Sequence, residues 1–234
     1  MKRLFSFPLI FFLLTSLCWM WGCAGPPRLH FFSEATLPMI GCRDLQLSGS
    51  WQFVHIVEAT PPGYKTVTLM GVVQIHETLQ ELHCALLSLE GLVLFEAHWK
   101  DGETTVLRAL PPFDKPGFTD GLMADLGFIF LAPEITSQVF GRMDDGTPVC
   151  RYELADGEIR DMMAFLDGGW KLMRYAKGSR LVQTLMADGP SDSDPAAPMP
   201  RHLSLITHGL LGYRLTLTLV SADALSSSAS SSEK

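Results

Sequence analysis

The strongest pattern in the chain is YRLTLTL at residues 213–219, where apolar and polar side chains alternate without a break. Because successive side chains of a strand point to opposite faces, this alternation predicts a strand with one buried face. The same period runs through residues 47–57 and 67–75. Gly71 interrupts the second of these runs and predicts a bend or bulge there.

Shorter runs of the same kind predict strands elsewhere, at residues 81–89, 92–99, 103–109, 148–154, 169–176, 180–186 and 202–207. The dipeptides Asp101-Gly102, Asp156-Gly157 and Gly168-Gly169 stand between such runs and are typical of tight hairpin turns. The chain therefore predicts a mainly antiparallel β-domain.

One central segment departs from the period of two. Thr119 is a candidate cap for a helix from Asp120 through Phe130 that is apolar over much of its surface. A second short helix is predicted from Pro133 to Phe140. A large sheet with one apolar face can curl, and a helix can lie against its concave side, so the predicted class is mainly β with an α insert (α+β).

Composition excludes one class of function. The 234 residues are 47% apolar and 18% charged, and the formal net charge is −7. An acidic chain without a basic stripe repels phosphate backbones, so we expect no nucleic-acid partner.

The N-terminus predicts export. Lys2 and Arg3 precede an apolar run over residues 4–17, which is short for a transmembrane anchor and typical of a secretory signal. The sequence Met-Trp-Gly-Cys at residues 20–23 resembles a bacterial lipobox, which makes residues 1–22 the signal peptide and Cys23 the lipid attachment site. A cut after Ala24 would instead release a soluble periplasmic protein.

Three cysteines remain after Cys23: Cys42, Cys84 and Cys150. An odd number leaves at least one thiol unpaired, and the spacings fit no metal motif. Cys84 lies in a strand-like apolar run and is predicted to be a core residue. A bridge between Cys42 and Cys150 stays open as an alternative.

The mature chain divides into three parts by composition. Residues 23–44 are predicted to be a lipidated tether, residues 45–222 the β-domain, and residues 223–234 a disordered Ser-rich tail. We expect the polar stretch at residues 187–200 to be a surface loop within the domain.

No catalytic signature is present. The chain lacks a G-x-S-x-G elbow, a P-loop and an H-E-x-x-H motif, and its seven histidines are scattered. We therefore expect no enzyme, no cofactor and no metal site. Leu110 and Phe113 flank two prolines, and they either face a membrane or partner from this loop or pack into the core.

Several of these features together resemble an uncharacterised bacterial lipoprotein family related to the LolA and LolB lipoprotein carriers. They are the hairpin region at 89–102 with its Trp99-Lys100-Asp101-Gly102 turn, the Leu-Pro-Pro-Phe loop at 110–113, the apolar helix at 121–131 and the strand at 211–215. The resemblance spans roughly residues 45–222.

The resemblance implies an incomplete, curved antiparallel β-barrel with a helical lid over an apolar cavity. It also implies binding of acyl chains, with the outer membrane reached through the N-terminal lipid and a periplasmic carrier protein as a candidate partner. Ala24 directly after the lipidated cysteine, in place of Asp, is typical of outer-membrane sorting. The inward residues that would line the cavity, or fill a solid core, are Trp51, Phe53, Val67, Leu69, Val73, Leu215 and Leu217.

Three functions remain open at this stage. The first is a lipidated carrier or acceptor of lipids or lipoproteins. The second is a non-catalytic assembly or scaffold lipoprotein of the cell envelope. An enzyme acting on acyl groups is third, because it would need a polar cluster inside the cavity.

Overall fold

The computed structural model describes residues 26–31, 49–76, 81–177, 180–189 and 199–225. The strands of this part of the chain form one thirteen-stranded antiparallel sheet. In chain order they are β1 (His30–Phe31), β2 (Ser50–Thr60), β3 (Val67–His76), β4 (Glu81–Leu87), β5 (Val93–Lys100), β6 (Glu103–Ala109), β7 (Ile135–Arg142), β8 (Pro148–Leu154), β9 (Ile159–Ala164), β10 (Trp170–Tyr175), β11 (Leu181–Ala187), β12 (His202–Thr207) and β13 (Arg214–Ala224).

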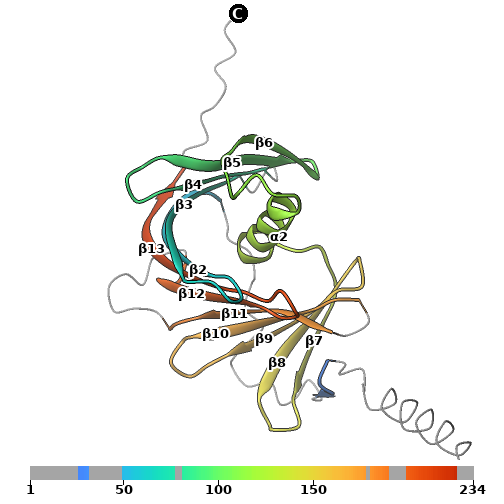
Figure 1. Cartoon of the computed structure of the whole chain (residues 1–234). Coiled ribbons are helices and arrows are strands. Elements are labelled where there is room, and N and C mark those ends of the chain that lie inside the picture. Colours follow the sequence, from blue (N-terminus) through green and yellow to red (C-terminus); the bar gives the residue numbers. More distant parts are fainter. Residues whose placement is uncertain (1–25, 32–48, 77–80, 178–179, 190–198, 226–234) are drawn as a thin grey trace, which may run out of the picture.

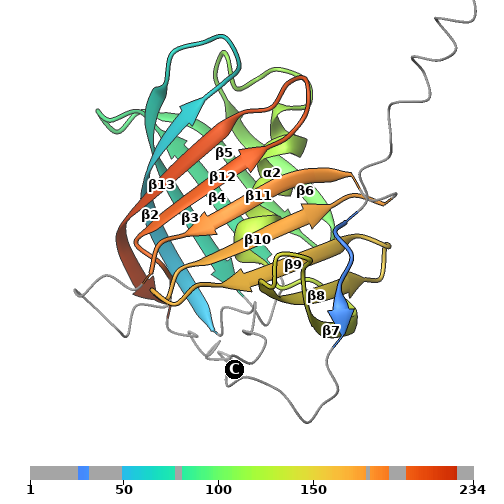
Figure 2. The same ribbon diagram turned by 90° about the horizontal axis from the view of Figure 1, so that it is seen from below.

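The sheet consists of two meanders. Strands β2 to β6 follow one another along the sheet, as do β7 to β13, and β13 pairs with β2 to join the two sets. The joining strands are long, since Arg214 pairs with Thr60 at one end and Ala224 with Trp51 at the other. The sheet curves strongly, and β6 and the short β1 form its two edges (Figures 1 and 2).

The helix α2 (Phe118–Phe130) lies inside the curve, against the concave face (Figure 1). Its buried residues include Leu126, Phe128 and Phe130. Gly117 caps its N-terminus in a left-handed conformation with φ of 77° and no side-chain cap bond, so Thr119 is not the cap. In the described part of the chain no helix has the length and apolar character needed to cross a bilayer.

Side chains of α2 and of the concave face form the main core. Phe53, Phe95, Leu82 and Leu205 are among its fully buried members. A second, smaller cluster of Val149, Met163, Met173 and Tyr175 packs against the N-terminal segment through Leu29.

A buried ion pair helps to attach this N-terminal segment to the sheet. Asp161 is fully buried and accepts hydrogen bonds from Arg151 Nε at 2.6 Å and Nη2 at 2.7 Å. Arg151 Nη2 also donates to the Pro27 carbonyl at 2.9 Å. Residues 26–31 are thus attached to the sheet, whereas the sequence predicted a tether over 23–44; Cys42 lies outside the described residues.

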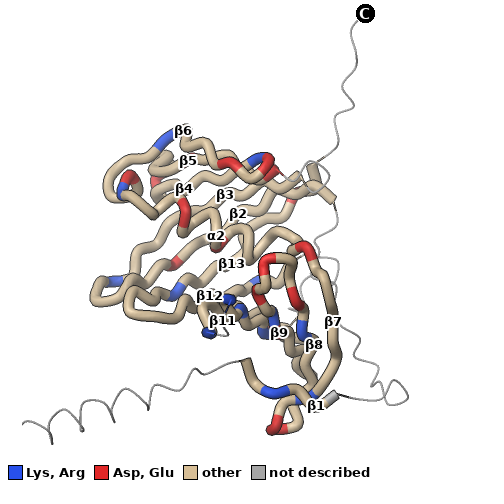
Figure 3. Tube along the Cα trace, turned by 90° about the vertical axis from the view of Figure 1, so that its right-hand side faces the viewer, with Lys and Arg blue, Asp and Glu red and all other residues tan. Residues whose placement is uncertain are grey.

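The predicted fold class is confirmed: the structure is an open, curved, mostly antiparallel sheet with one helix in its described part. The predicted hairpin turns at Asp101-Gly102, Asp156-Gly157 and Gly168-Gly169 are also confirmed, because each of these pairs connects two neighbouring strands. Acidic and basic residues are interspersed over the described chain (Figure 3).

The second predicted helix was wrong, and one of the two features predicted as alternatives at Gly71 is absent. Residues predicted as a helix from Pro133 to Phe140 form β7, because β-branched residues such as Ile135 and Val139 favour a strand and β8 supplies its hydrogen-bonding partner. Gly71 marks no bulge, since its pairing with His55 and Leu86 is regular. A Cβ there would lie 3.0 Å from Val57 Cγ2, so glycine makes room for that side chain.

One further strand and one boundary also differ from the prediction. The sequence pattern missed β9, and β13 extends through Asp223 and Ala224, which were predicted to belong to the disordered tail. Asp223 and Ala224 pair with Gln52 and Trp51, so β2 supplies the partner that keeps them in the sheet.

Two glycines at the start of α2 provide a test of its backbone. Gly117→Ala should lower the free energy of unfolding by about 1–2 kcal/mol, because its φ of 77° is costly for any residue with a Cβ. Gly121→Ala should raise it by about 0.5–1 kcal/mol, since a Cβ at this helical position meets open space. Urea unfolding of both variants checks this, and equal effects of the two substitutions would contradict it.

Candidate functional site

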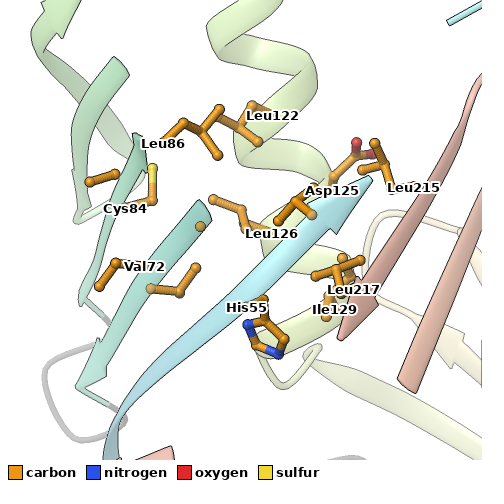
Figure 4. Close-up of a pocket in the computed structure, with 14 residues that line it drawn as sticks. His55, Val72, Cys84, Leu86, Leu122, Asp125, Leu126, Ile129, Leu215 and Leu217 are labelled. Atoms are coloured by element: carbon orange, nitrogen blue, oxygen red, sulfur yellow. The ribbon is translucent and has the colours of Figure 1, made fainter. Parts of the chain in front are cut away.

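A small pocket lies between α2 and the concave face, at strands β2, β3, β4 and β13 (Figure 4). Its volume is about 40 Å³, well below the roughly 300–1,000 Å³ of ordinary ligand pockets. The residues that line it are His55, Val57, Gly71, Val72, Val73, Cys84, Ala85, Leu86, Leu122, Asp125, Leu126, Ile129, Leu215 and Leu217. Most of its wall is therefore aliphatic.

The side chains of the pocket wall follow two periodicities, that of a strand and that of a helix. Val57, Val73 and Leu217 lie on the inward face of their strands, where the period of two collects apolar side chains. Leu122, Leu126 and Ile129 project from one side of α2, at the three- and four-residue spacing of helix neighbours.

Two of the side chains that line this pocket titrate at a nitrogen or an oxygen atom, and His55 is one of them. Its side chain is 1% exposed, and its Nε2 atom has no hydrogen-bond partner. The ring packs against Phe53 and Phe130, with centroids 6.1 and 5.9 Å away. Burial lowers the pKa of His55 from 6.5 to about 4, so the imidazole is neutral at physiological pH.

Asp125 is the other, and it attaches α2 to the far half of the sheet. Its Oδ1 accepts a hydrogen bond from Gln183 Nε2 on β11 at 2.6 Å, and its Oδ2 accepts one from the Tyr213 hydroxyl. Burial raises the pKa of the Asp125 carboxyl, while these two donors and Arg174 oppose that rise. The two carboxylate oxygens of Asp125 thus have partners on β11 and in the β12–β13 turn.

The hydrogen bonds continue from Gln183 across the concave face. Gln183 Oε1 accepts from Arg174 Nη1 at 2.8 Å, and Glu158 accepts from Arg174 Nε at 2.6 Å and from Arg160 Nε at 2.7 Å. The two guanidinium carbons lie 5.1 and 5.8 Å from the centre of the Phe128 ring of α2. The carboxylates of Glu158 and Asp125 therefore offset the two guanidinium charges, those of Arg160 and Arg174, beneath the helix.

Cys84 is a free thiol on the inward face of β4. It is 3% exposed, its Sγ atom lies 3.8 Å from Met123 Sδ on α2, and burial raises its pKa to about 11. These values agree with the predicted core role and make the thiol unreactive while α2 stays in place. Cys150 takes part in a disulfide bond.

Three of the seven predicted cavity residues line the pocket, namely Val73, Leu215 and Leu217. Trp51 and Phe53 instead pack beside it, with Phe53 stacked on Phe130 at 5.7 Å. Leu69 is buried outside the pocket lining, and Val67 is 47% exposed at the start of β3. Those two do not line the pocket.

The two loop residues singled out in the sequence, Leu110 and Phe113, have different environments. Leu110 is 37% exposed, whereas Phe113 is half-buried and its ring contacts Phe118 with centroids 5.2 Å apart. Phe113 therefore packs into the core, and Leu110 remains available to a membrane or a partner.

Apolar side chains with larger exposed fractions than Leu110 lie in other hairpin turns at the same end of the sheet. Antiparallel pairing brings the β2–β3, β4–β5 and β12–β13 turns to this end (Figure 2). They carry Tyr64, Leu89, Leu92, Leu210 and Leu211, of which Leu210 is fully exposed. The Leu210-Leu211 pair, placed in a turn beside Gly209 and Gly212, was the sequence signal for this set.

The polar residues of the site were not predicted from the sequence. Asp125 is a single acidic residue within the apolar run of α2, and this was the available signal for it. His55 occupies an inward position of a strand whose neighbours at that face are Phe53 and Val57, which made it a candidate buried histidine.

Comparison with known proteins adds one structural likeness. No family model and no curated protein matches the sequence. Among solved structures, the chain is similar to a LolA superfamily protein from Nitrosomonas europaea, with a TM-score of 0.48 and 10% sequence identity over 78% of this chain and 90% of that one.

Removing the Asp125 carboxylate should weaken the attachment of α2. Asp125→Ala leaves the buried donors of Gln183 and Tyr213 without a partner, so we expect a loss of roughly 2–4 kcal/mol in the free energy of unfolding. The control is Asp120→Ala on the exposed first turn of the same helix, with a loss below about 1 kcal/mol. Urea unfolding measures both, and a similar small loss for the two variants would contradict the assigned role of Asp125.

The buried His55 predicts an acid-sensitive stability. Below pH 6.5 the unfolded chain binds a proton at His55, which the folded chain, with a pKa of about 4, does not bind, so stability falls as the pH falls through this interval. Between pH 7 and pH 5 the loss from this residue should be about 2 kcal/mol. His55→Phe should remove that part of the pH dependence, and urea unfolding at the two pH values measures it. An unchanged pH dependence of the free energy of unfolding would contradict the role assigned to His55.

Proposed function

We propose that the protein binds acyl chains of lipids or lipoproteins between α2 and the concave face of its sheet, without catalysis. The observation that carries the proposal is the pocket itself, whose wall is aliphatic on both the helix and the strands. The polar groups beneath α2 hydrogen-bond one another, as in a structural network, and this supports a binding role over an enzyme.

Binding requires α2 to move. A volume of about 40 Å³ holds only a small part of an acyl chain. Each buried CH₂ contributes about 0.8 kcal/mol. An acyl chain that takes over the contacts of Leu122, Leu126 and Ile129 with the strands therefore keeps the apolar surface of those strands buried. The exchange costs little on that side of the helix, and several methylenes give useful affinity without any charged contact.

The exposed leucines suggest where an acyl chain enters and leaves. Val57, Leu86 and Leu215 of the pocket lie toward the end of the sheet that carries Leu210 and Leu211. Contact between these turns and a bilayer or another carrier would shorten the path of the chain through water. This extends the membrane or partner role expected of Leu110 to the neighbouring hairpin turns.

We further propose that the chain acts as an outer-membrane lipoprotein, held through a lipid on Cys23 and facing the periplasm. The support is the lipobox-like sequence and the Ala24 that follows it. A periplasmic lipoprotein carrier would be the partner. A scaffold role in envelope assembly is the second candidate, and the exposed leucines at one end favour it as a protein-binding surface.

Filling the pocket should block acyl binding. Val73→Phe adds a ring to a buried wall of the pocket, and we expect at least about tenfold weaker binding of a fluorescent fatty-acyl probe, since a few methylenes lose their place. The matched control is Val54→Phe on β2, which pairs with Val72 and is absent from the pocket wall. Circular dichroism checks the fold of each variant.

Native mass spectrometry of the protein expressed as residues 1–234 provides the second arm of this test. Added mass that matches acyl chains and is removed by detergent supports the carrier. A protein that carries no lipid and takes up none of the offered probe would overturn acyl binding, and a pull-down would then test the scaffold role.

A further inference from the structure

We propose that His55 hydrogen-bonds a hydroxyl group on the bound acyl chain, so that the pocket selects hydroxylated acyl chains over unsubstituted ones. The inference rests on the proposed acyl binding and names the ligand class of that same site. It begins from a polar atom that nothing in the described part of the chain satisfies.

The geometry around His55 favours a ligand as its partner. The residue lines the pocket, it is 1% exposed, and its Nε2 atom is buried without a partner (Figure 4). Phe53 and Phe130, which also stack on each other, both pack against the imidazole ring and offer it no hydrogen-bonding atom. A buried polar atom without a hydrogen-bond partner destabilises the folded protein. A ligand that supplies the missing hydrogen bond removes this penalty, which strengthens its binding.

Charge narrows the chemistry of the ligand group. Asp125 lines the same pocket, so an anionic head group placed there would meet a second carboxylate. A cation would lose its hydration among aliphatic walls, and both oxygens of the Asp125 carboxylate already accept hydrogen bonds from Gln183 and Tyr213. A neutral group is therefore favoured, in agreement with the lowered pKa of the histidine.

A hydroxyl fits better than a group that can only accept. The neutral imidazole carries its proton on either Nδ1 or Nε2, and Nε2 is accordingly an acceptor or a donor. A hydroxyl can donate to the first form and accept from the second. It adds little bulk to an acyl chain, which matters in a pocket whose remaining wall is apolar.

The experiment compares matched probes on the full-length protein. Methyl octadecanoate is measured against its 3-hydroxy and 12-hydroxy derivatives, by displacement of a fluorescent fatty-acyl probe. The wild-type protein should bind at least one hydroxylated ester about three- to tenfold more tightly than methyl octadecanoate, which is the yield of one net hydrogen bond.

Three variants isolate the role of His55. His55→Phe should lose the preference, so that the ratio of its affinities for the hydroxylated and the unsubstituted esters falls to about one. His55→Gln retains a neutral hydrogen-bonding group and should keep part of the preference. His202→Phe makes the same change at an exposed histidine of β12 and should leave the preference unchanged.

Each remaining outcome counts against the inference. Equal affinities for all esters in the wild type, or a preference that survives in His55→Phe, would overturn the role of His55 and leave acyl binding in place. Failure of every ester to bind the wild type would overturn acyl binding itself, and with it this inference.

Discussion

The hydrogen bonds that Asp125 accepts from Gln183 and Tyr213 fix the position of α2, and the rest of the concave face depends on that position. A carboxylate that is 4% exposed must have partners, and those of Asp125 lie on β11 and in the β12–β13 turn. With α2 in place, Leu126 and Phe128 complete the core. Without it, the inward faces of β2 to β4 and β13 would lie open to water.

The two halves of the concave face hold α2 by different means. Toward β9 to β11 the contacts include hydrogen bonds and guanidinium–ring contacts, which are directional and weaken steeply when a partner shifts. Toward β2 to β4 they are apolar contacts, which another apolar group can replace. The proposed opening for an acyl chain therefore lies on this apolar side of the helix.

The sequence predicted the strands wherever one face is apolar and the other polar, as in the run from Leu215 to Leu219. It could not predict β9, because both faces of that strand carry buried charged residues: Arg160 reaches Glu158 on one side, and Asp161 pairs with Arg151 on the other. The same cause hid much of the site. The apolar wall follows from periodicity, whereas the hydrogen-bond partners of Asp125, which are Gln183 and Tyr213, lie far away in the sequence, and no local pattern encodes them.

The pairing of β13 with β2 also has a consequence for how the chain reaches its native state. Each meander assembles from hairpins between neighbours, but β2 lacks its second partner until the last described strand has been synthesised. Contacts of such long range form late and slowly. During that interval the free edge of an eleven-residue strand with an apolar face is exposed to other chains, so aggregation, rather than loss of one strand, is the expected fate of any product that stops before β13.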